Sequence, residues 1–144
     1  MGSIAWKKCS RMHSVTIKRF NRTYISISTT NEALYVITDW LRDDVSNSFV
    51  SWREWLRSIG EDKREAESNA TWLEKHGDQL TLTAITDILT YEYQGNPIPE
   101  GYRIHMSIQN AIELINSWEE LLKTKPEQIM IYEENGVYRM KEVQ

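Results

Sequence analysis

Three histidines and a single cysteine are the side chains of this chain with the widest chemical repertoire. His13, His76 and His105 lie too far apart to form a His-x-His or His-x-x-x-His pair, and the chain has no Cys-x-x-Cys. Most protein metal sites show one of these short spacings. No glycine-rich phosphate-binding loop occurs among the six glycines. The sequence therefore predicts no metal site and no cofactor.

Cys9 and His13 are the one pair that could act together, as nucleophile and base. A reactive thiol needs a fixed, electropositive environment. Lys7 and Lys8 supply positive charge near Cys9, but nothing in the sequence indicates how the thiol would be held. His76 stands before Gly77-Asp78 and fits a turn better than a catalytic base. The sequence favours a binding protein, with a small enzyme that uses Cys9 or a histidine as an alternative.

Carboxylates gather in the middle of the chain, next to two tryptophans. Aromatic anchors beside acidic groups are typical of protein-binding surfaces. Carboxylates held on a rigid scaffold can also take the place of phosphates and attract a basic partner. We expect these residues to form the partner-binding face: Asp43, Asp44, Trp52, Glu61, Asp62, Glu65, Glu67 and Trp72.

Charge is unevenly distributed along the chain. Residues 1–30 contain six of the 17 basic residues and no acid, so this segment carries +6. The remaining 11 basic residues face all 21 acids, which gives −10 for residues 31–144 and −4 overall. An acidic body repels nucleic acid and favours a basic partner. A nucleic-acid-binding module that uses the basic N-terminal hairpin, with Phe20 and Tyr24 among its cations, remains the alternative function.

Size and composition fit one globular domain. The chain has 144 residues, of which 40% are hydrophobic, and no apolar run is long enough to span a bilayer. One cysteine cannot form an intramolecular disulfide, and residues 1–12 do not resemble a secretory signal. We expect a cytoplasmic protein with no membrane partner, folded as a single domain over 1–144, in which residues 1–12 are the least ordered.

The pattern of apolar residues predicts strands and helices in the order ββ, αα, ββ, β, α, ββ. Thr29 and Glu32 form a capping box for the first helix, Ser107 caps the last, and Pro126 ends it. Asn135-Gly136 is a strong hairpin signal. The polar residues 61–68 are expected to form a loop or a loose helical turn, and 87–100 to end as a loop. The expected hairpins are 13–28, 70–85 and 129–143, the expected strand is 102–106, and the expected helices are 29–45, 51–59 and 107–125.

These elements predict an α+β fold. Strands outnumber the helical crossovers that a parallel sheet would need. We therefore expect a mainly antiparallel sheet packed on one side by two or three helices.

Three segments resemble the immunity proteins of bacterial contact-dependent growth inhibition and related polymorphic toxin systems. They are MSIQNAIELINSWEELLKTKPEQIMIYEENGVYRM at 106–140, ITDWLRDD at 37–44 and SNATWLEKHGDQLTL at 68–82. The order of elements is similar across 13–142. The resemblance implies a cytoplasmic antitoxin that binds the C-terminal toxin domain delivered by a neighbouring cell, commonly a nuclease, and blocks its active site or substrate surface. No contact residues carry over, and the basic N-terminal segment departs from the acidic character expected against a nuclease.

Overall fold

The structure is a computed structural model that describes residues 13–58 and 70–144, and the backbone of 62–65. The expectation for residues 1–12 lies outside this range. In the described part, no helix is long and apolar enough to cross a membrane.

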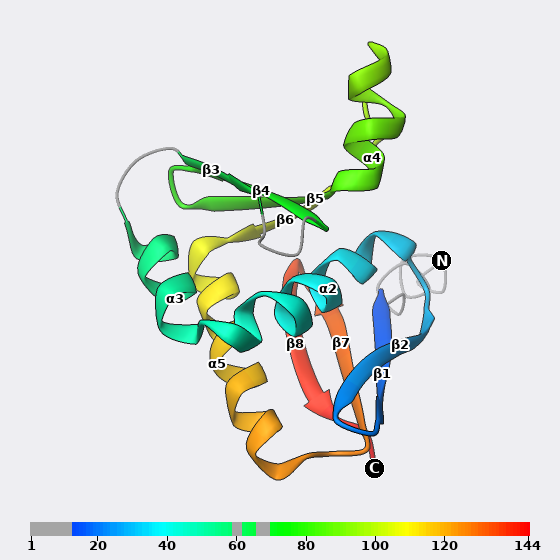
Figure 1. Ribbon diagram of the computed structural model, residues 1–144, viewed down its shortest axis with the longest axis vertical. Helices are drawn as coiled ribbons and strands as arrows, with labels where there is room; N and C mark the ends of the chain where they lie inside the picture. The colour runs from blue at the N-terminus through cyan, green and yellow to red at the C-terminus, as the bar shows by residue number, and fades with distance from the viewer. Residues whose placement is uncertain (1–12, 59–61, 66–69) are drawn as a thin grey trace, which may run out of the picture.

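The described residues form eight strands in two four-stranded antiparallel sheets (Figure 1). The first sheet has the order β2-β1-β7-β8 and pairs the two ends of the chain. Its strands are β1 (Ser14–Phe20), β2 (Thr23–Thr29), β7 (Gln128–Glu134) and β8 (Val137–Glu142). The second sheet, β3-β4-β5-β6, is built from the middle of the chain. Its strands are β3 (Asp62–Glu65), β4 (Thr71–His76), β5 (Gln79–Ala84) and β6 (Ile104–Ser107).

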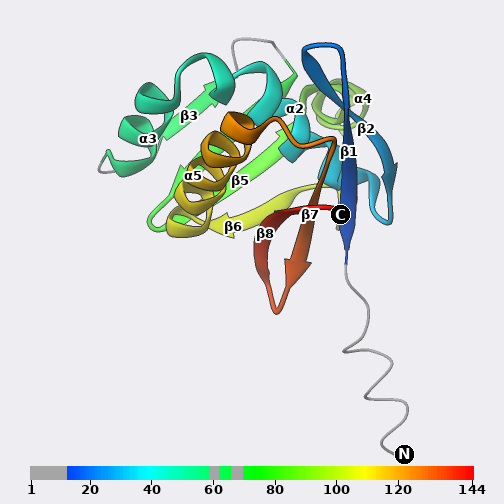
Figure 2. The same cartoon turned by 90° about the horizontal axis from the view of Figure 1, so that it is seen from below.

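Helices α2 (Tyr35–Asp43) and α5 (Ile108–Thr124) hold the two sheets together, because each contacts strands of both. Helix α3 (Phe49–Arg57) lies beside α5 along one flank of the molecule (Figure 2). The described residues also form the short helix α4 (Ile85–Thr90) and three 3-10 turns. These turns are η1 (Glu32–Leu34), η2 (Val45–Asn47) and η3 (Glu92–Gln94).

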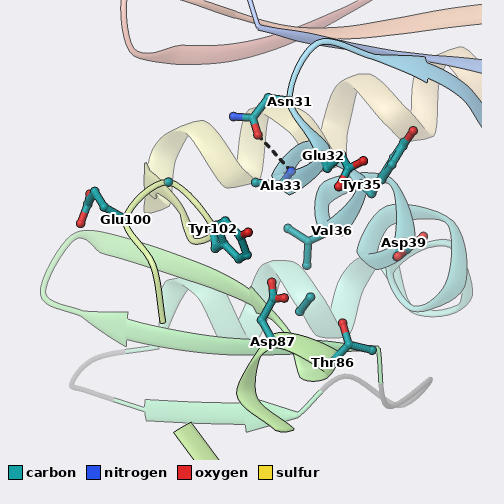
Figure 3. A pocket seen from close by; sticks show the side chains of 12 residues that line it. Asn31, Glu32, Ala33, Tyr35, Val36, Asp39, Thr86, Asp87, Glu100 and Tyr102 are labelled. Atoms are coloured by element: carbon teal, nitrogen blue, oxygen red, sulfur yellow. Dashed lines mark hydrogen bonds between the residues drawn. The ribbon is translucent and has the colours of Figure 1, made fainter. Parts of the chain in front are cut away.

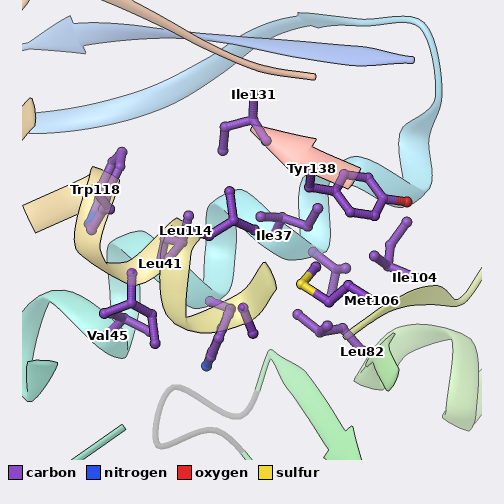
Figure 4. Close-up of a cluster of buried hydrophobic side chains, with 14 of the residues drawn as sticks. Ile37, Leu41, Val45, Leu82, Ile104, Met106, Leu114, Trp118, Ile131 and Tyr138 are labelled. Atoms are coloured by element: carbon purple, nitrogen blue, oxygen red, sulfur yellow. The ribbon is translucent and has the colours of Figure 1, made fainter. Parts of the chain in front are cut away.

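The hydrophobic core occupies the space between the sheets (Figure 4). Ile37 on α2 and Leu114 on α5 meet Ile131 from the first sheet and Leu82 from the second, and each is at most 1% exposed. Burying one such side chain stabilises the fold by about 1.5–3 kcal/mol. One continuous core therefore joins all the layers.

Tryptophans link α2 to α3 within this core. The Trp52 ring meets Trp40 edge-on at 5.6 Å and Trp55 edge-on at 5.7 Å between centroids. Edge-on aromatic pairs add about 0.5–1.5 kcal/mol to the burial of their surface. Both Trp40 and Trp52 are fully buried.

The expected α+β class with antiparallel pairing is confirmed, but the strands divide between two sheets. The first sheet depends on pairing between β1 and β7, in which Ile17 stands opposite Ile129. Local periodicity defines each hairpin and does not indicate which hairpins pair over such a long separation.

Two local expectations are wrong. The first helical turn is capped by Asn31, whose Oδ1 accepts from the Ala33 amide at 3.1 Å. Thr29 instead ends β2 and donates its hydroxyl to the Ser14 carbonyl at 2.9 Å. Residues 62–65, expected in a loop, form β3 because their backbone pairs with β4.

Two other local signals are confirmed. The Ser107 side chain accepts from the Asn110 amide at 3.0 Å and caps α5. Asn135 and Gly136 have φ of 53° and 80°, the left-handed pair that a tight hairpin turn requires.

Candidate functional site

Residues 85–103, here called the arm, form a long excursion between two neighbouring strands. Antiparallel β5 and β6 are paired with Leu82 opposite Ile104, so a tight turn could connect them. The chain instead builds α4 and η3, which project from the body (Figure 1). None of residues 85–103 is buried. The arm adds little to the core and is therefore the part of the fold most in need of a functional explanation.

The arm is held by contacts between its own residues. The rings of Tyr91 and Tyr102 meet edge-on at 5.8 Å between centroids. An Arg103 guanidinium nitrogen lies 3.1 Å from a Glu92 carboxylate oxygen. Gly95, with φ of 83°, ends the η3 turn in the left-handed conformation. The arm thus has a defined shape even though it lies outside the core.

Large apolar side chains are exposed along the arm. The exposed fraction is 54% for Leu89, 79% for Tyr93 and 43% for Tyr102. Tyrosine combines a large contact area with a polar tip and is enriched in protein-binding surfaces. The arm therefore has the composition of a protein contact.

A cleft of about 600 Å³ opens where the arm meets α2. Figure 3 shows Glu32, Tyr35 and Val36 on one side and Asp87 on the other, with Tyr102 beside them. The cleft is lined by the η1 turn, the start of α2 and both ends of the arm. Its lining residues are Asn31, Glu32, Ala33, Tyr35, Val36, Asp39, Ala84, Thr86, Asp87, Glu100, Gly101 and Tyr102.

Among the described residues, the lining contains no basic side chain and the four carboxylates of Glu32, Asp39, Asp87 and Glu100. Asp39 is partly neutralised by Arg42, whose Nη2 lies 3.1 Å from the carboxylate. Arg42 also forms a bidentate pair with Asp43, which leaves less of its charge for the cleft. In the described part of the chain, the other three carboxylates form no ion pair. The cleft is therefore suited to a cation supplied from outside.

Burial raises the pKa of the Asp87 carboxyl above its ordinary value. Burial also raises the pKa of Asp39, although Arg42 opposes this shift. Partial desolvation disfavours the charged carboxylate, and an incoming cation would reverse that effect. Charge in the cleft thus costs free energy until a partner neutralises it.

The structure corrects two residues of the partner-binding face predicted from sequence. Asp44, at the end of α2, is only 1% exposed, and Trp52 is fully buried between Trp40 and Trp55. Neither can contact a partner without disrupting the core. Their acidic and aromatic character suggested a surface, but their positions in the helices turn them inward.

The other predicted residues fall into two groups. Asp43 remains partly exposed but is paired with Arg42 at 2.7 Å, and half-buried Trp72 donates its indole N–H to Glu74 at 3.0 Å. The register of β3 and β4 brings Glu65 opposite Trp72 and Asp62 opposite Lys75. The described atoms do not include the side chains of Asp62 and Glu65, nor any part of Glu61 and Glu67. A role for these six residues stays a prediction.

Two of the histidines each contact a neighbouring side chain. His105 Nδ1 lies 3.0 Å from Thr81 Oγ1, and His76 Nε2 lies 3.3 Å from Glu74 Oε2. Among the residues with described positions, no three His, Cys, Asp or Glu side chains cluster as metal ligands would. Cys9 lies outside that set, so the Cys9–His13 alternative is untested.

The cleft carboxylates were not singled out from sequence because they come from separate segments. Glu32 and Asp39 are seven residues apart, two helical turns, and so share one side of the η1–α2 segment. Asp87 and Glu100 lie at the two ends of the arm, whose fold the sequence leaves ambiguous. The available signal is three tyrosines, Tyr91, Tyr93 and Tyr102, within a segment rich in glycine and proline.

Comparison of the chain with models of known families, with curated proteins and with solved structures finds no match.

Proposed function

We propose that this protein is a cytoplasmic immunity protein without catalytic activity of its own. It would bind a cognate toxin domain that a neighbouring cell delivers. The toxin is expected to be a nuclease. The arm and the acidic cleft at its base would contact it directly.

The observation that carries this proposal is the arm between β5 and β6. Two adjacent antiparallel strands need only a short turn, yet here they are joined by an excursion without a buried residue. Exposed apolar side chains such as Leu89 and Tyr93 reduce solubility unless a partner covers them. The excursion is best explained as a surface for another macromolecule.

The charge of the cleft indicates the chemistry of that partner. Asp87 and Glu100 form no ion pair within the described residues, and such carboxylates match an arginine or lysine side chain of the partner. Nucleases bind phosphates with basic residues, so a carboxylate surface can occupy the place of their substrate. The resemblance of the element order to immunity proteins supports the same class of partner.

Co-expression tests this function. The chain is produced together with the C-terminal domain encoded immediately upstream of its gene, and growth and complex formation are measured. We expect that domain to be toxic alone, and harmless in a tight complex with this protein. If no complex forms and toxicity is not relieved, the immunity function is excluded for that pair.

A further inference from the structure

The first sheet has an outer face, turned away from the core, that differs from the cleft in charge. Val15, Ile17, Ile129 and Ile131 point inward and are fully buried. Because strand side chains alternate between faces, their neighbours in β1 and β7 point outward. These neighbours are half-buried or exposed. The outer face thus belongs to β1, β2, β7 and β8 and shares no residue with the cleft.

Basic side chains occupy three consecutive cross-strand rows of this face. Arg139 stands opposite Tyr132, Lys141 opposite Met130, and Lys18 opposite Gln128. Rows on one face of a sheet are about 7 Å apart, so the cations form a regular series. No residue in these three rows carries a carboxylate. The rows are Ser14, Tyr132 and Arg139; Ser28, Thr16, Met130 and Lys141; and Ile25, Lys18 and Gln128.

Each of two aromatic rings on this face has a lysine ammonium over it. Lys18 Nζ lies 5.6 Å from the centroid of the Phe20 ring, which is 48% exposed. Lys141 Nζ lies 5.1 Å from the centroid of the half-buried Tyr132 ring. A base that stacks on either ring would displace the ammonium group from the ring face toward the phosphate of the same nucleotide.

We propose that this outer face binds single-stranded nucleic acid. Bases stack on Phe20 and Tyr132, and the phosphates meet Lys18, Lys141 and Arg139. Tyr132 stands opposite Ser14, and Phe20 is six residues further along β1, so the rings are about 20 Å apart with room for several nucleotides. Stacking needs unpaired bases, which a duplex does not offer. The rows also contain the apolar Met130 and Ile25, but the cation in each row favours this ligand over an apolar protein surface. This inference does not depend on the proposed function.

Fluorescence anisotropy of a labelled oligouridine of about 12 nucleotides tests the proposal with the full chain. We expect a dissociation constant in the micromolar range at about 50 mM salt, because the acidic body weakens attraction. The logarithm of the binding constant should fall with the logarithm of salt concentration with a slope of about −2 for three phosphate contacts. Phe20→Ala should weaken binding by about fivefold or more.

A matched pair of charge reversals distinguishes binding at this face from the effect of net charge on binding. Lys141→Glu and Lys123→Glu make the same change in net charge, but Lys123 lies on α5 with its side chain 65% exposed. We expect Lys141→Glu to weaken binding by about tenfold, and Lys123→Glu by about twofold at most. Amide chemical-shift changes on titration should concentrate in β1, β7 and β8.

Four results would overturn the proposal. The first is the absence of an anisotropy change at about 100 μM protein and low salt, and the second is an equal loss of affinity in the two lysine variants. The third is equal affinity for a duplex of the same length. The fourth is self-association of the chain that Phe20→Ala abolishes. The last result would assign this face to contacts between copies of the chain.

Discussion

Asp87 lies at the base of the arm, in a cleft that offers it no cation within the described part of the chain. Burial raises its folded-state pKa above the ordinary 3.8. A raised carboxyl pKa contributes stability that is fully present below pH 3.8 and lost as pH rises through the folded pKa. At neutral pH the charge of Asp87 therefore opposes folding, while in our proposal it favours the complex.

Asp87→Asn should separate these two effects. We expect the free protein to melt at an equal or higher temperature at pH 7, and the toxin complex to be weaker by about tenfold, or 1.4 kcal/mol. Scanning calorimetry and titration calorimetry measure the two quantities. Glu54→Gln, an exposed carboxylate on α3, is the control and should change neither. A variant that melts lower and binds normally would contradict this role for Asp87.

Asn110 makes an inward contact that the helical pattern does not reveal. Its Nδ2 donates to the Tyr138 carbonyl at 2.7 Å, and its Oδ1 accepts from the Tyr138 amide at 2.8 Å. Both groups are buried, so Asn110 replaces a neighbouring strand for part of the β8 edge. Asn110→Leu would leave the Tyr138 backbone without partners and should cost about 2–4 kcal/mol in urea unfolding. Gln109→Leu, on the exposed side of α5, should cost far less; equal losses would contradict this role.

Tyr138 should respond to alkaline pH. Burial, reinforced by the nearby Glu133 carboxylate, raises the pKa of its phenol to about 12 from 10.0. The phenol must ionise more readily in the unfolded chain, so its contribution to stability is complete below pH 10 and is lost as pH rises through 12. In an ultraviolet titration, Tyr138→Phe should remove one late-titrating phenol. An unchanged titration curve would show that Tyr138 ionises normally.

The arm is the element whose removal should cost function and spare the fold. Ala84 lies two residues after Leu82, and Tyr102 lies two residues before Ile104, the partner of Leu82, at the open end of the β5–β6 pair. Replacing residues 85–101 with Asn-Gly would close this pair with a two-residue turn. Far-ultraviolet circular dichroism should show the fold retained, while binding of the toxin domain is lost. Retained binding would remove the arm from the proposed interface.

Lys75 contacts the C-terminal end of α3 in a way that the sequence does not indicate. Its side chain is 1% exposed, and its Nζ donates to the carbonyls of Trp55 and Ser58 at the end of α3. A cation at a helix C-terminus is favoured by the helix dipole. Lys75→Met keeps the apolar stem but leaves those carbonyls without this donor. We expect it to lower the free energy of unfolding by about 1–3 kcal/mol, whereas Lys123→Met at the surface should have little effect.

Hairpins and helices were largely predictable because their signals are local. Ser107 and Asn135-Gly136 act on residues next to them, and both predictions are confirmed. β3 was not predictable, because its polar residues become a strand only through pairing with β4. The arm was not predictable either, since its shape depends on contacts such as Tyr91 with Tyr102 rather than on burial.

Across the whole molecule, charge is separated between two surfaces. Within the residues that the structure describes, the cleft carries carboxylates without a basic lining residue, and the three rows of the outer sheet face carry cations without a carboxylate. The sequence predicts an acidic binding face with aromatic side chains that includes Asp44 and Trp52, and both of these residues are buried. Proximity in sequence does not indicate exposure, and the cleft brings together residues from 31 to 102 that only the fold places side by side.

Titration calorimetry of the toxin domain with paired charge reversals tests the proposed interface most directly. The double variant Asp87→Lys, Glu100→Lys reverses two cleft carboxylates, and Glu54→Lys, Glu120→Lys makes the same change on exposed positions of α3 and α5. We expect the cleft variant to bind at least about 100-fold more weakly than the wild type, and the control to stay within about threefold. Equal affinity of the two double variants would contradict binding at the cleft.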